Sequence, residues 1–157
     1  MIDYIPNVEA EEIAAEIIAK FHPNLTGIKI AHLLKVRPVP KKKSTKQPRQ
    51  GRKVVMAKAS KVSAKMQALA SQDYKFVIEY DSMIWDELNS DTRTALVDHE
   101  LCHCGNDADG CYMKNHSVEE FREILSRYGF WKDDVLQFAE TTEEVYHGTM
   151  EATNGGQ

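Results

Sequence analysis

Residues 99–103 read His-Glu-Leu-Cys-His, and two histidines with this spacing can bind one ion only if the segment is an α-helix. At about 3.6 residues per turn, His99 and His103 stand about 40° apart on one helix face, one turn removed. Both imidazoles can then reach an ion about 2.0 to 2.1 Å away. Small or aliphatic neighbours are suited to pack the other faces of this helix. The fold must therefore contain a helix that packs on most sides and leaves one side open.

Glu100 completes the pattern. It lies about 100° around the helix from His99, too far to join the coordination easily but close enough to hydrogen-bond a water molecule on the metal. Zinc lowers the pKa of bound water towards about 7, so Glu100 could accept its proton and later pass it to a leaving amine. We therefore expect Zn²⁺ as the cofactor, His99 and His103 as metal ligands, and Glu100 as the catalytic general base.

The predicted site still needs a third protein ligand, with one position left open for water. His116 is the first candidate, because it follows residues 104–115 and precedes a helix start that could direct it to the metal. The other candidates are explained more simply by capping, solvated faces, turns or strand packing, or are too remote in sequence to judge: Glu119, Glu120, Asp107, Asp109, His22, His32 and His147.

The three cysteines suggest a competing metal site. Cys102, Cys104 and Cys111 could join His116 in a Cys₃His structural zinc site. Two cysteines separated by one residue on a helix point about 200° apart, however, and lack the usual spacer between zinc ligands. An odd number of closely spaced cysteines also does not resemble a disulfide framework. We expect reduced thiols that pack behind the histidines or in the core.

Three further residues have roles that spacing leaves open. Asp98 could orient a ligand histidine, and it could equally lie exposed to solvent. Tyr112 or Tyr128 could stabilise an oxyanion, but nothing in the spacing selects either of them.

The whole chain is predicted to form an α+β fold with an N-terminal helix, a small mixed β-sheet, the active-site helix and C-terminal helices. Hydrophobic periodicity, capping residues and turn residues define these elements. They are a helix over 8–21 capped by Asn7, a strand over 25–36, a β-prone run over 53–59, a short helix within 60–70, a strand over 74–80, a helix over about 92–104 between a Ser90 or Asp91 cap and Gly105, a loop over 106–115, a helix opened by Ser117 and Glu120, and a last helix over 133–148.

Charge is distributed unevenly along the chain. The net charge is −4, yet residues 17–72 hold 14 Lys and Arg and no Asp or Glu. Residues 35–65 alone hold 12 basic residues, and the proline-containing part at 38–53 is predicted to be an exposed loop. No aromatic residue lies between 22 and 73, so nucleic-acid contact through 35–65 would be nonspecific. A solvated loop is the simpler explanation of the basic run.

Length and hydropathy limit the number of domains and the expected location of the protein. The 157 residues fit one domain, taken as 1–150 and followed by a disordered tail at 151–157. No apolar run is long enough to cross a bilayer, and the N-terminus lacks the features of an export signal. We expect a cytoplasmic protein without membrane contact, and the sequence does not indicate an oligomeric state.

The stretch ALVDHELCHC, the NDADG turn and the following HSVEEFREILSRYGFW together resemble the family named "Putative phage metallopeptidase", small zincin-like proteins of bacteriophages and prophages. The resemblance covers roughly residues 8–131, including YKFVIEYDSMIWDEL. It implies a zincin-like fold, His99, His103 and His116 as metal ligands, Glu100 as the catalytic glutamate, and the host cell cytoplasm as the location. A weaker similarity to SprT-like proteases, which act near DNA, lacks their third histidine close after the motif.

These features predict a zinc-dependent peptidase that hydrolyses a protein or peptide substrate through a metal-activated water. One alternative is a zinc-containing, non-catalytic binding module that contacts nucleic acid or host protein through 35–65. Another is metal-assisted hydrolysis of a non-peptide substrate.

Overall fold

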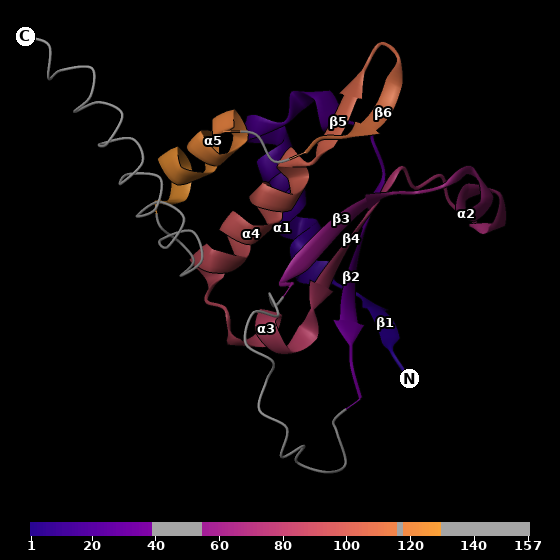
Figure 1. The fold of residues 1–157 in the computed structure, drawn as a ribbon, viewed down its shortest axis with the longest axis horizontal. Helices are drawn as coiled ribbons and strands as arrows, with labels where there is room; N and C mark the ends of the chain where they lie inside the picture. The colour runs from indigo at the N-terminus through magenta and orange to yellow at the C-terminus, as the bar shows by residue number, and fades with distance from the viewer. Residues whose placement is uncertain (39–54, 116–117, 130–157) are drawn as a thin grey trace, which may run out of the picture.

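The computed structural model describes residues 1–38, 55–115 and 118–129, with only the backbone of 118–121 (Figure 1). Its helices and strands form the mixed α+β arrangement that the sequence predicts. In chain order they are β1 Asp3–Pro6, α1 Val8–Phe21, a 3-10 turn Pro23–Leu25, β2 Ile30–Val36, β3 Ala57–Lys61, α2 Ala64–Leu69, β4 Phe76–Asp81, α3 Ser82–Glu87, α4 Ser90–Cys102, β5 Cys104–Asp107, β6 Gly110–Met113 and α5 Val118–Tyr128.

Four strands form a mixed sheet in the order β1-β2-β4-β3. The central pair, β2 and β4, is parallel, and both outer strands run antiparallel to their neighbours. In β4 the side chains of Phe76, Ile78 and Tyr80 are buried and alternate with half-buried residues, which confirms the strand predicted from its aromatic and β-branched composition. The edge strand β1 is exposed along its whole length, so no alternation in the sequence indicates it.

Helices α1 and α4 pack on the same face of the sheet (Figure 1). α1 buries Ala10, Ala14 and Ile17 at helical spacing, and Asn7 caps it as predicted, since its Oδ1 accepts a hydrogen bond from the Ala10 N–H (3.1 Å). α4 contributes Leu96, Val97 and Leu101 to the same core. The helix that carries the predicted ligands is therefore held by the core on most sides.

The end of α4 differs from the prediction. The helix spans Ser90–Cys102 with Asn89 as N-cap, and Gly105 does not end it but lies in β5. The segment predicted as a loop is a tight hairpin of β5 and β6. At its turn the Asp107 carboxylate accepts a hydrogen bond from the Asp109 N–H (2.9 Å), an Asx-turn that accounts for Asp107 by turn chemistry, as the sequence predicts.

Several predicted features lie wholly or largely outside the described residues. They are the basic loop at 38–53, the Ser117 and Glu120 capping box, His116, the last helix at 133–148 and the tail at 151–157. No helix in the described part of the chain is long and apolar enough to cross a membrane.

Candidate metal centre on helix α4

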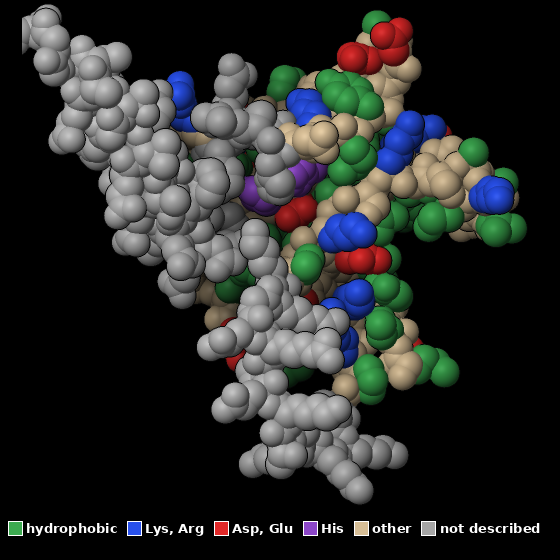
Figure 2. Space-filling view, viewed as in Figure 1, with side chains coloured by type: hydrophobic (Ala, Val, Ile, Leu, Met, Phe, Trp, Pro, Cys, Tyr) green, Lys and Arg blue, Asp and Glu red, His purple; other side chains and the backbone are tan. Residues whose placement is uncertain are grey.

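His99 and His103 lie one turn apart at the C-terminal end of α4. Their ring centroids are 5.2 Å apart and the ring planes are nearly perpendicular, at 83°. Both residues are half-buried, and histidine side chains reach the surface beside a carboxylate between the β5–β6 hairpin and β3 (Figure 2). The predicted helix thus brings the two imidazoles together in a place that solvent can reach.

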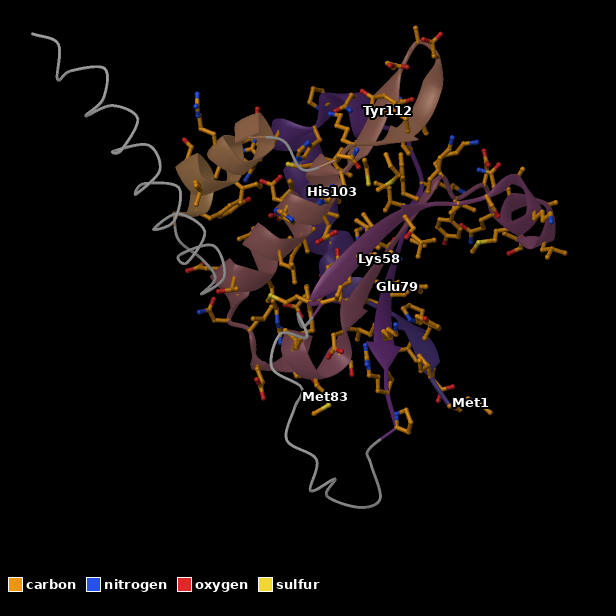
Figure 3. The ribbon with its side chains drawn as sticks, viewed as in Figure 1. Met1, Lys58, Glu79, Met83, His103 and Tyr112 are labelled. Carbon is orange, nitrogen blue, oxygen red and sulfur yellow. The ribbon has the colours of Figure 1, made fainter. Side chains whose placement is uncertain are left out.

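The hairpin fixes the ring of His103. His103 Nδ1 lies 2.8 Å from the Lys114 carbonyl oxygen, and because a carbonyl can only accept, Nδ1–H is the donor. The Lys114 N–H in turn donates to the His103 carbonyl (2.8 Å). Figure 3 shows His103 where α4 meets this hairpin. With Nδ1 protonated, Nε2 carries the lone pair that a metal needs, so this donor set fits a metal ion.

Glu100 is buried on α4, at 5% exposure. Burial raises the pKa of the Tyr80 hydroxyl well above its usual value, and the negative charge of Glu100 raises it further. The same two effects raise the pKa of the Cys104 thiol to about 12. Glu100 therefore lies close to β4 and to the start of the hairpin.

The cysteines do not form the competing zinc site in the described part of the chain. Cys104 lies in a strand rather than a helix, with its Sγ 3.7 Å from the Glu100 carbonyl oxygen, and the three cysteines do not form a close group of ligand atoms among the described residues. Cys102 points to Asp98, with Sγ 3.9 Å from Oδ1. Cys111 is half-buried in the hairpin, its Sγ 3.7 Å from Asn106 Oδ1. All three are outside any disulfide, as predicted.

Asp98 is completely buried, which corrects the expectation that it could equally be solvent-exposed. Its Oδ1 lies 2.6 Å from Nε2 of His22, a residue expected to have no part in this region. Its Oδ2 accepts hydrogen bonds from Arg127 Nη1 (2.7 Å) and from the Tyr128 hydroxyl (2.8 Å). Asp98 therefore joins three helix ends, and none of these three bonds is made to His99 or His103.

The ionisation of Asp98 follows from these partners. Burial by itself would raise its pKa, but hydrogen bonds from His22 and Tyr128 and the positive charges of His22 and Arg127 outweigh burial and lower the pKa below its usual value. The carboxylate is therefore ionised at neutral pH. The Tyr128 hydroxyl has its pKa raised by burial and by this carboxylate, so it donates to Asp98 and is not available as an oxyanion donor.

His22, Asp98 and Cys102 are also a group of three ligand-type side chains whose donor atoms lie within 4.8 Å of one another. Among the described residues this is the one such group. Both oxygens of Asp98 already have strong donors, and Arg127 balances its charge, so a cation there would compete with a guanidinium. We therefore interpret the group as a hydrogen-bonded structural cluster.

Two other residues considered in the sequence, His32 and Tyr112, lie in strands. His32 lies in β2, with Nδ1 3.0 Å from the Tyr80 hydroxyl, outside the His99 and His103 pair. Tyr112 lies half-exposed in β6 (Figure 3). The part played by Arg127 was not predicted, because no spacing rule links it to residue 98.

An HExxH helix packed on a mixed sheet, with one histidine oriented through Nδ1, is the arrangement expected of a metallopeptidase domain. Residues 2–142 match the family described as "Putative phage metallopeptidase". The chain therefore belongs to this family, as its motifs predict. No curated protein and no solved structure matches the chain.

Proposed function

We propose that this member of the family is a zinc-dependent peptidase of zincin-like fold, with His99 and His103 as two of its metal ligands. The observation that carries the proposal is the hydrogen bond from His103 Nδ1–H to the Lys114 carbonyl (2.8 Å), on a residue one turn from His99. Contacts of this type orient ligand histidines at metal sites.

His116 is proposed as the third ligand on the basis of chain geometry. Lys114 is bonded to His103 through both its N–H and its carbonyl, and His116 follows it by two positions. Two residues of extended chain span about 7 Å at most. A side chain at position 116 would therefore be close enough in sequence to reach an ion that His99 and His103 held.

Glu100 is proposed as the general base. It is buried on α4, within electrostatic range of Tyr80 and Cys104. From this position it would take a proton from the attacking water and deliver it to the leaving amine. A bound zinc ion would polarise the scissile carbonyl and make the water more acidic.

The edge strand β3 is proposed to hold the peptide substrate. It is the last strand of the described sheet, it pairs with β4, and it also contacts α4 and β6. An extended peptide can add to such an edge through main-chain hydrogen bonds. A peptide bound there would run beside the helix that carries Glu100.

The Glu100→Gln variant tests the proposal. With zinc still bound, hydrolysis of a fluorescence-quenched peptide library is expected to fall about 100-fold or more, because a positioned general base contributes that much. Glu79→Gln is the matched control, since Glu79 lies on the sheet face opposite the buried residues of β4. Hydrolysis that survives Glu100→Gln would overturn the role of Glu100 as general base, and a zinc-loaded wild type that hydrolyses no peptide would overturn the peptidase assignment. Unchanged zinc affinity in His116→Ala would show that the third ligand is a residue other than His116.

A second candidate function, the binding module, is favoured by the charge of residues 35–65, which hold 12 basic and no acidic residues. Contact with nucleic acid would depend strongly on salt. In the described part, the cross-strand neighbours of Lys35 and Lys58 are Asp81 and Glu79, which reduce the positive charge of the sheet face. Persistence of the biological effect in zinc-loaded Glu100→Gln would favour this function over the peptidase.

A further inference from the structure

Asp98 is the point where three helices meet beside the proposed metal ligands. His22, the C-cap of α1, lies 2.6 Å from one carboxylate oxygen. Arg127 and Tyr128, the last two residues of α5, lie 2.7 and 2.8 Å from the other oxygen. The Arg127 guanidinium also lies 4.0 Å from the ring centroid of Phe21 at the end of α1. We call these four residues around Asp98 the Asp98 clamp.

Asp98 immediately precedes His99 and so points about 100° around α4 from it. Hydrogen bonds from α1 on one oxygen and from α5 on the other therefore resist rotation of α4 about its own axis. Rotation would move His99 and His103 together, away from the hairpin and from β3.

We infer that Asp98 is a positioning residue, which sets through the Asp98 clamp the direction in which α4 presents His99 and His103. The inference rests on the proposed function, because it assigns the clamp to the same metal site. Outer contacts that hold ligand residues in place typically change metal affinity by about 10- to 100-fold when they are lost.

The chain contains a matched control for this effect. Arg93 of α4 and Glu9 of α1 form an ion pair (2.8 Å) at the opposite end of α4 from the histidines. This pair joins the same two helices, but it is more exposed, with 20% and 47% of the two side chains accessible. If Asp98 only held α1 and α4 together, loss of the Glu9 carboxylate should affect zinc affinity in the same way as loss of the Asp98 carboxylate.

The test compares zinc affinity with folding stability in the full chain. Zinc dissociation constants are measured by chelator competition for wild type, Asp98→Asn, Tyr128→Phe and Glu9→Gln. The melting temperature of each metal-free protein is measured in parallel. Asp98→Asn is expected to weaken zinc binding about 10-fold or more, and Tyr128→Phe, which removes one hydroxyl, by a smaller factor. Glu9→Gln is expected to leave zinc affinity unchanged whatever it does to the melting temperature.

Each result decides a different point. Wild-type zinc affinity in both folded clamp variants would overturn the inference, and if Asp98→Asn fails to fold, Tyr128→Phe alone decides. Zinc that remains bound in a His99→Ala and His103→Ala double variant would also overturn it, because the metal would then lie away from the two histidines that the clamp is inferred to position.

The proposed function can fail separately from the clamp. If the wild type binds no zinc, the peptidase proposal falls, and the clamp is judged from histidine ring signals in NMR spectra of the metal-free chain. Tyr128→Phe is then expected to shift the His103 ring signals, while Glu9→Gln leaves them in place. Unshifted signals in Tyr128→Phe would reject the clamp independently of any metal.

Discussion

His32 is a buried histidine whose ionisation opposes folding at low pH. It lies in β2 at 7% exposure, and burial lowers its pKa from 6.5 to about 4. Because the unfolded chain binds this proton at higher pH than the folded chain, stability rises with pH across the interval. As the pH falls from 6.5 to 4, His32 is expected to remove about 3 kcal/mol from the free energy of unfolding.

Urea denaturation at a series of pH values measures this loss, with His32→Gln as the comparison. Glutamine stays neutral, and its side-chain oxygen can accept a hydrogen bond from the Tyr80 hydroxyl. In the wild type this hydroxyl lies 3.0 Å from Nδ1 of His32. The difference in free energy of unfolding between wild type and His32→Gln should therefore change between pH 6.5 and 4 and stay constant above pH 7.5. A difference that does not change with pH would show that His32 is not held neutral by burial.

Local spacing was enough to predict some residues of the site and not others. His99 and His103 contact each other because they lie one turn apart on a helix, which is a property of neighbouring sequence. The partners of Asp98 are 76, 29 and 30 positions away, so their contacts exist only once α1, α4 and α5 have packed. No periodicity in the chain carries that information.

At the scale of elements, Gly105 is required by the ring that packs on it across the hairpin. A Cβ at Gly105 would lie 2.5 Å from the Tyr112 ring, its cross-strand neighbour. Because Tyr112 is 40% exposed, the ring can swing outwards. Gly105→Ala is therefore expected to cost about 1 kcal/mol, at the low end for overpacking, in chemical denaturation.

A double-mutant cycle separates this contact from other effects at position 105. In a Tyr112→Ala background the added methyl group meets no ring, so Gly105→Ala should cost clearly less than in the wild type. Equal costs in both backgrounds would mean that the ring of Tyr112 does not make Gly105 necessary.

Elements with a strong periodicity could be predicted, and short exposed strands could not. α1 shows one apolar stripe and β4 alternates buried and half-buried residues, so each carries its own signal. β5 and β6 have four residues each, and their strand structure depends on pairing with each other. Prediction therefore extended α4 to about residue 104, where the hairpin already begins.

For the molecule as a whole, the core and the proposed metal centre are largely separate. The core cluster joins α1, β4 and α4 through residues such as Ala14, Phe76 and Leu96, whereas His99 and His103 are half-buried outside it. A chain of this length does not need a metal to fold. The metal-free protein is therefore expected to stay folded and to gain stability when zinc is added.

The gain follows from binding to the folded state alone. At a free zinc concentration of 100 times the dissociation constant it is about 2.7 kcal/mol, which corresponds to several degrees in melting temperature for a chain of this size. His103→Ala should abolish most of this zinc-dependent increase, because it removes a proposed ligand from the helix. His32→Gln, which alters a histidine in the sheet, should retain it. Calorimetry with and without chelator measures both, and an equal zinc-dependent increase in His103→Ala would place the ion away from α4's histidine pair.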